Sequence, residues 1–191
     1  MTSSCLSLTG WLHRVALVGA LVLTAAVALP ISTGLAQGTP IASPAVSGAI
    51  DVTGRVLRPG PLSVADLQAL PSETVDVAFE SGGKAQDHTF TGVRLIDVLG
   101  YLGLDVAADA HHPLLPMYLV VTANDGYQVV ISGGEIDPDF GNVPMLLAWD
   151  EDGVPLAGDQ GPLRLVVPGD KHGGRNVFGV VTIDVRTVAG G

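Results

Sequence analysis

Cysteine is almost absent from this 191-residue chain. The single one, Cys5, comes before an apolar run that begins at Val15, so a product cleaved after that run contains no thiol. Such a product cannot form a disulfide, bind a metal through a thiolate or use a cysteine nucleophile. The composition therefore excludes disulfide-stapled scaffolds and thiol-based enzymes for that product.

Positive charge is also scarce. The chain has 9 Lys and Arg against 19 Asp and Glu, for a formal net charge of −10. All the acids and all the basic residues except Arg14 lie from Asp51 onward, so this part alone carries a charge of about −11. Such a surface repels phosphate backbones and anionic lipid. We therefore expect a soluble domain that does not bind nucleic acid.

The N-terminal part has the pattern of an export signal. Arg14 precedes the apolar run 15–29, which is shorter than the about 20 residues that cross a bilayer comfortably. Gly34 and Ala36 are the small residues expected at positions −3 and −1 of a cleavage site before Gln37. We predict a signal peptide over 1–36, rather than an uncleaved anchor, and export to the periplasm, cell envelope or exterior without a remaining membrane span.

A Pro/Ser/Gly/Ala-rich segment over 37–49 is predicted to be a flexible linker, followed by one domain over 50–189. Alternating apolar residues predict nine strands there. They lie near 50–56, 75–79, 89–93, 118–122, 127–131, 145–149, 154–156, 163–167 and 181–185.

Two short helices are predicted among these strands. One is capped by Ser63 and runs to about Leu70, and the other covers 94–102 with one apolar stripe. We expect a polar connection over 80–88 and irregular structure over 132–143. Because strands outnumber helices and do not alternate regularly with them, the predicted fold class is α+β with mixed sheets.

A glycine-rich basic loop lies between the last two predicted strands. Glycine lets backbone N–H groups face a ligand, and Lys and Arg add charge for a phosphate or a flat polar ring. The alternative is an ordinary glycine-rich hairpin with solvated cations. The candidate binding residues in this loop are Lys171, His172, Gly173, Gly174, Arg175 and Asn176.

The chain offers no clear metal motif. His111 and His112 are adjacent and so point in opposite directions on a strand, and no third ligand stands at a suitable spacing. We therefore predict a loop rather than a metal site at this position.

Five segments occur in an order typical of one family. They are LSVADL at 62–67, FTGVRL at 90–95, ANDGY at 123–127, LLAW through DGVPL at 146–156, and GPLRLVVPG at 161–169. This order, spread over about 52–185, resembles the molybdopterin-binding domain of the sulfite oxidase family. The resemblance implies a compact α+β domain of mixed sheets in which loops hold a pterin.

The resemblance also shows where this chain departs from the family. Family enzymes ligate molybdenum through a cysteine upstream of the helix, but the corresponding stretch 78–82, AFESG, has none, and Phe90 replaces the usual Trp. An alkoxide from Ser81 is a poor substitute for a thiolate at this metal. The resemblance therefore implies a pterin cofactor, either molybdopterin or a metal-free pterin, and makes molybdenum doubtful.

The pterin-holding residues are better matched. Arg175 falls on the family's arginine, whereas Phe178 stands where the enzymes commonly have lysine, a charge that Lys171 and His172 are hypothesised to replace. In the other loop, Asp125 is suited to accept two N–H bonds from an amino-pyrimidine edge.

Asn124 and Tyr127 complete this second group of candidates, with Tyr127 stacking on the ring or hydrogen bonding beside it. The alternatives are an ordinary turn acid at Asp125 and a packing role for Tyr127. Arg164 is interpreted as an ion-pair partner on a sheet face.

Three functional hypotheses follow. The leading one is an exported, non-catalytic pterin-binding domain, a sensor or carrier that works with a membrane-bound partner protein. The second is a molybdenum or tungsten oxidoreductase with atypical metal ligation. The third is a cell-envelope interaction domain that has kept the fold and lost the pocket.

Overall fold

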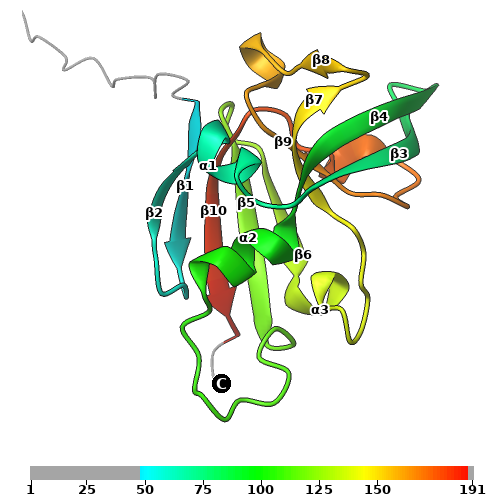
Figure 1. Ribbon diagram of the computed structural model, residues 1–191. Coiled ribbons are helices and arrows are strands. Elements are labelled where there is room, and N and C mark those ends of the chain that lie inside the picture. Colours follow the sequence, from blue (N-terminus) through cyan, green and yellow to red (C-terminus); the bar gives the residue numbers. More distant parts are fainter. Residues whose placement is uncertain (1–47, 189–191) are drawn as a thin grey trace, which may run out of the picture. The chain divides into compact units, whose positions relative to one another are not determined.

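The computed structural model describes residues 48–188, which form two five-stranded sheets and short helices (Figure 1). The predicted signal peptide and most of the predicted linker lie outside the described residues. Within 48–188, no helix has the length and hydrophobicity to cross a membrane.

The first sheet has the strand order β2-β1-β10-β5-β6. Its strands β1 and β10 run parallel, and its other neighbours are antiparallel. Every second residue of β5 is buried, so one face of this sheet packs on the core. The strands are β1 (Ala49–Gly54), β2 (Gly60–Ser63), β5 (Met117–Ala123), β6 (Gln128–Ser132) and β10 (Val180–Thr187).

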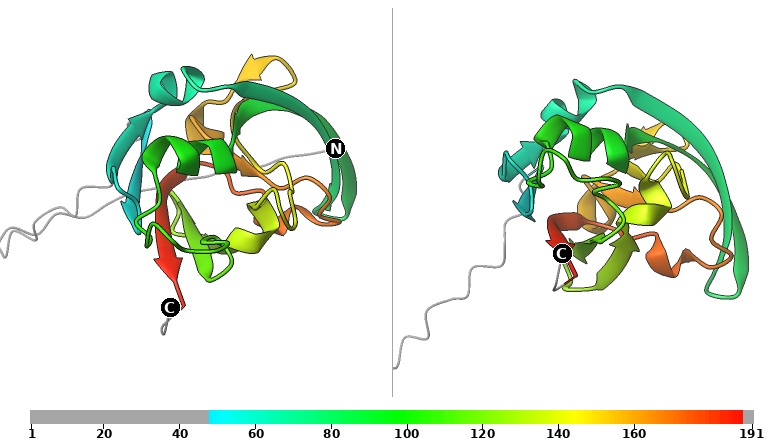
Figure 2. Two further views of the ribbon diagram at one scale, coloured as in Figure 1. Left: turned by 60° about the horizontal axis from the view of Figure 1, so that its bottom comes forward. Right: turned by 90° about the horizontal axis from the view of Figure 1, so that it is seen from below.

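The second sheet is antiparallel and has the order β3-β4-β7-β8, with β9 paired to β7. Figure 2 shows its β3–β4 hairpin curving away from the helices toward the loop that carries η2. The hairpin contacts that loop through a backbone bond of 2.9 Å from the Glu80 N–H to the Lys171 carbonyl. The strands are β3 (Ser72–Ser81), β4 (Lys84–Arg94), β7 (Leu146–Glu151), β8 (Val154–Pro155) and β9 (Arg164–Val166).

The helices are short and are fixed by local signals. The Ser63 hydroxyl and the Asp66 carboxylate form a capping box at the start of α1, as the sequence predicts. The apolar stripe of α2 packs on the main core, which also contains residues of both sheets. The helices are α1 (Val64–Gln68), α2 (Leu95–Leu102) and α3 (Gly133–Ile136), with 3₁₀ turns η1 (Gly158–Gln160) and η2 (Gly173–Arg175).

The prediction of a polar connection over 80–88 is wrong. β3 and β4 instead continue to a tight turn at Gly82 and Gly83, whose φ angles of +58° and +73° suit a two-residue hairpin. Polar residues dominate this outer part of the hairpin, so apolar alternation gives no signal for it.

Two further elements differ from the prediction. The segment Gly60–Ser63, for which no strand is predicted, forms edge strand β2, where Pro61 is tolerated. The irregular structure expected over 132–143 contains α3, whose capping box joins Ser132 and Glu135. The two glycines that open α3 have low helix propensity, which explains why the pattern conceals it.

Candidate functional site

Two loops that are far apart in sequence lie side by side. The Asn124 N–H donates to the Gly179 carbonyl at 2.8 Å, and the Tyr127 hydroxyl donates to the Gly174 carbonyl at 2.8 Å. These bonds tie the β5–β6 turn to the η2 loop. A cavity of about 790 Å³, called here the main cavity, opens between them.

Six of the candidate residues line the main cavity, and three do not. Asp125 also closes its own turn, because its Oδ1 accepts from the Tyr127 N–H at 2.8 Å. Asp159 and Phe178 line the cavity as well, although the sequence did not suggest either as a ligand contact. The six candidates on the wall are Asn124, Asp125, Tyr127, Gly173, Gly174 and Asn176.

Asn176 holds the loop from within. It is 4% exposed, and its Oδ1 accepts from the Val167 N–H at 2.7 Å. Its Nδ2 is buried and has no hydrogen-bond partner among residues 48–188. One end of this side chain thus fixes the loop to the end of β9.

Arg175 does not line the main cavity. Its Nε and Nη2 donate to Asp170 at 2.8 and 2.7 Å, and its Nη1 donates to Glu135 at 2.8 Å. Hydrogen bonding to Asp170 raises the pKa of Arg175, and the same interaction lowers the pKa of Asp170. The guanidinium predicted to meet a phosphate is therefore bonded to two carboxylates.

Lys171 and His172 also lie elsewhere. They line a separate cavity of about 470 Å³ beside the β3–β4 hairpin. The His172 Nδ1 is 3.7 Å from a carboxylate oxygen of Glu80. The structure therefore does not bring these two side chains to the main cavity as the sequence suggested.

Arg164 lies beneath the wall of the main cavity. It is 3% exposed, and its Nη1 donates to Glu151 at 3.1 Å, which agrees with the predicted ion pair. Its guanidinium stacks 3.8 Å from the Phe178 ring centroid and 4.8 Å from that of Phe90. Burial lowers the pKa of Arg164, against the opposing effect of the Glu151 charge.

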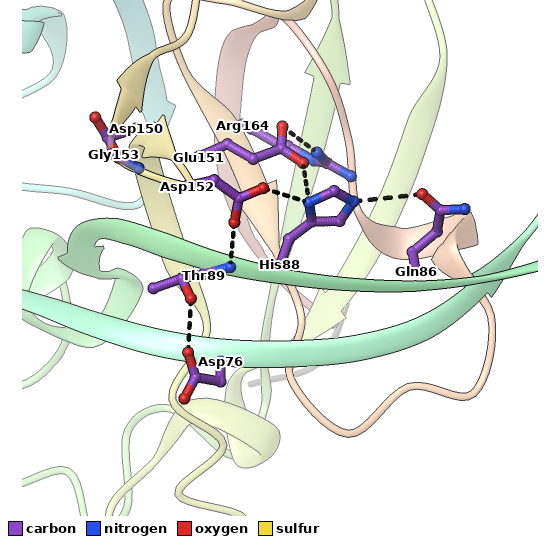
Figure 3. A network of polar contacts seen from close by, with 9 residues as sticks. All are labelled: Asp76, Gln86, His88, Thr89, Asp150, Glu151, Asp152, Gly153 and Arg164. Atoms are coloured by element: carbon purple, nitrogen blue, oxygen red, sulfur yellow. Dashed lines mark hydrogen bonds and ion pairs between the residues drawn. The ribbon is translucent and has the colours of Figure 1, made fainter.

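A polar network extends from Arg164 to the surface (Figure 3). The His88 Nδ1 lies 2.8 Å from Asp152 and 3.3 Å from Glu151, and its Nε2 lies 3.3 Å from Gln86. The pKa of Asp152 is lowered, first by the His88 bond and then by the Thr89 N–H. Sequence reasoning missed this network because β4–β7 pairing brings together residues 64 apart.

The fold and the loop-built cavity define a small α+β ligand-binding domain. The sequence model of the family described as "Oxidoreductase molybdopterin binding domain" matches residues 38–189, and the chain belongs to this family. The predicted fold of the sulfite oxidase type is confirmed. No curated protein matches the chain.

Among solved structures, the chain is similar to the sulfane dehydrogenase SoxCD from Paracoccus pantotrophus, with a TM-score of 0.58 and 20% sequence identity. The match covers 73% of this chain and 39% of the SoxCD chain. At this identity the likeness shows the fold alone. The chain thus spans well under half the length of the SoxCD chain that it matches.

The family implies a cofactor made of a pterin and molybdenum. The residues of this chain suit the pterin ring better than they suit the metal. The stretch 78–82 offers only oxygen donors, from Glu80 and Ser81, and within 48–188 no three His, Cys, Asp or Glu side chains are grouped as metal ligands. Molybdenum bound through a thiolate does not fit this donor set. A flat heterocycle fits the main cavity, because carboxylate, amide and aromatic side chains line its wall.

Proposed function

We propose that this protein is an exported pterin-binding domain that binds its ligand without chemistry on a metal and serves as a sensor or carrier. It would work with a membrane-bound partner protein. The single observation that carries the proposal is the main cavity between the β5–β6 turn and the η2 loop. Family membership supplies the class of ligand.

The polar groups of the cavity match a pterin edge. Asp125 uses one carboxylate oxygen for its own turn, and its other oxygen remains to accept an N–H. The Asn124 side-chain amide lies on the same wall. An aminopyrimidine ring presents adjacent N–H donors, so a carboxylate and an amide carbonyl on one wall form a suitable acceptor pair.

A non-catalytic role follows from the chemistry of the donors. Oxygen-atom transfer in this family depends on the metal, and the oxygen donors of stretch 78–82 do not reproduce a thiolate ligand. The residues of this chain bind and orient a ring in the cavity, but none of them replaces a redox centre. A sensor or carrier needs only that binding step.

Isothermal titration calorimetry of the purified protein with a reduced pterin tests the proposal. We expect saturable one-to-one binding that weakens about tenfold in Asp125→Asn. Asp109→Asn is the matched control, because Asp109 is exposed and lies in the loop at the opposite end of β5. No binding by any oxidised or reduced pterin would overturn the proposal, as would stoichiometric molybdenum in protein from a cofactor-producing host.

Export is a separate part of the proposal and rests on residues 1–36. Expression of the full chain in a bacterial host, followed by cell fractionation and mass spectrometry, tests it. We expect a product that begins at or near Gln37 in the exported fraction. A cytoplasmic product that retains the first 36 residues would contradict export and leave the binding proposal standing.

A further inference from the structure

The charges around the main cavity carry an inference about which pterin enters it. We infer that the ligand is a phosphate-free pterin, a flat ring that is neutral or cationic, rather than a phosphorylated form such as molybdopterin. This inference rests on the proposed function of the same cavity.

The wall of the main cavity is acidic. Of the ten residues from the described part of the chain that line it, Asp125 and Asp159 bear the charges, and none is Lys, Arg or His. A phosphate group brings one to two negative charges at neutral pH. Two carboxylates on the wall therefore oppose a phosphate ester and favour N–H donors or a cation.

The nearby arginines do not offset this acidity. Arg175 donates to both Asp170 and Glu135, so these three side chains together carry one negative charge. Arg164 is buried beneath Phe178 and is paired with Glu151. Both guanidiniums are therefore already neutralised by carboxylates.

The two other basic residues of the η2 loop do not line the main cavity. Lys171 and His172 line the separate cavity beside the hairpin, whereas Gly173 and Gly174 line the main cavity. The sequence pattern that suggests a phosphate loop thus places none of its cationic side chains on the main-cavity wall. A phosphate in this cavity would lack the paired cation that such groups normally receive.

The aromatic part of the cavity wall is suited to an uncharged ring. Phe178 lines the cavity while its ring is stacked on Arg164, so the aromatic side chain is held in place from below. A heterocycle can stack on such a fixed ring with little loss of side-chain entropy. The family's lysine position is thus occupied here by a stacking group instead of a charge.

A matched pair of ligands tests the inference. Neopterin and neopterin monophosphate differ by one phosphate group, and each can be titrated by calorimetry into the intact protein at about 20 mM and at about 300 mM salt. We expect neopterin to bind at least tenfold more tightly at low salt. The difference should shrink at high salt, because the Debye length falls from about 20 Å to about 6 Å.

Variants assign the selectivity to the wall. Asp159→Asn should raise the affinity for the monophosphate relative to that for neopterin by about threefold or more, whereas the control Asp109→Asn should leave this ratio unchanged. Equal or tighter binding of the monophosphate by the unmodified protein would overturn this inference and leave the proposed function intact. Absence of binding by both ligands would instead overturn the proposed function, and this inference with it.

Discussion

The two arginines beside the main cavity are both paired with carboxylates, yet their surroundings differ. Arg164 lies in strand β9, is 3% exposed and has one carboxylate partner, Glu151. Arg175 lies in the η2 loop, its side chain is 34% exposed, and it has two carboxylate partners. Desolvation lowers the pKa of the first, whereas hydrogen bonds raise the pKa of the second.

The difference shows that arginine has two structural roles beside this cavity, one as a buried charge and one as a link between surface elements. The charge of Arg164 is removed from water and depends on one partner and on the aromatic rings around it. The charge of Arg175 remains partly hydrated and joins the η2 loop to α3 through Glu135. Removal of a carboxylate should therefore cost much more at Arg164 than at Arg175.

The largest effect is expected at the buried pair. Glu151→Leu leaves the Arg164 charge buried without its partner, and we expect the free energy of unfolding to fall by about 3–5 kcal/mol. Urea denaturation followed by circular dichroism measures this loss. The double variant Arg164→Met/Glu151→Leu is the control and should recover most of it, because the buried charge of Arg164 is then removed together with its partner.

A cost below about 1 kcal/mol for Glu151→Leu would contradict this interpretation. It would mean that water reaches the Arg164 guanidinium and compensates the lost carboxylate. The comparison between the two arginines would then fail, because both would behave as solvated surface charges.

The next largest effect on stability is expected at one of two neighbouring glycines of η2. A Cβ at Gly173 would lie 2.9 Å from two ring carbons of Phe79, whereas a Cβ at Gly174 would meet nothing within 4 Å. We expect Gly173→Ala to lower the free energy of unfolding by about 1–2 kcal/mol through overpacking. Gly174→Ala should leave stability nearly unchanged but narrow the main cavity, and so weaken ligand binding.

Thermal unfolding and calorimetric titration of both variants measure these two outcomes. If both alanine variants were equally stable, close packing of the hairpin on the loop would not be the reason for glycine at 173. If Gly174→Ala bound a pterin as tightly as the unmodified protein, the ligand would not approach that part of the wall.

Local signals explain how much of the fold the sequence predicts. The capping box at Ser63 and the apolar stripe of α2 depend on residues at most four positions apart, so they can be predicted from the sequence alone. The outer β3–β4 hairpin and the edge strand β2 are polar or contain proline. The pairing of these strands is decided by their partners elsewhere in the sheet, so the alternation of apolar residues does not predict it.

The candidate site divides in the same way. The segment Asn124–Tyr127 lies near the η2 loop, as the family resemblance implies, because the segment follows β5 and the η2 loop leads into β10, which pairs with β5. The resemblance fails to anticipate the bond from Arg175 to Glu135, which lies 40 residues away. Such partners are set by how loops pack, and residue type alone suggested a cation free to bind phosphate.

A smaller effect is expected at the exposed arginine. The pKa of Asp170 is lowered in the folded protein, so its bond to Arg175 stabilises the fold above the ordinary carboxyl pKa of about 3.9. This contribution is lost as pH falls through the lowered pKa. Because the pair is partly hydrated and Glu135 remains, we expect Asp170→Asn to cost about 1 kcal/mol at pH 7.

Urea denaturation of both proteins between pH 7 and pH 2.5 checks this sign. The stability difference between the unmodified protein and Asp170→Asn should be constant above about pH 5 and vanish toward the acid end. A difference that grew as the pH fell would contradict the assignment, since a carboxylate with a lowered pKa can only lose its contribution on protonation.

The smallest effect is expected at the bond that joins the two loops. Tyr127→Phe removes the hydroxyl that donates to the Gly174 carbonyl at 2.8 Å, but Tyr127 is 51% exposed, so water can replace the donor. We expect a stability loss of about 0.5–1 kcal/mol and faster amide hydrogen exchange in the η2 loop. The phenyl ring keeps its stacking surface, so a pterin should lose no more than about fivefold in affinity. A loss of a hundredfold or more would show instead that the hydroxyl contacts the ligand, and the bond to Gly174 would then be a resting contact that the ligand displaces.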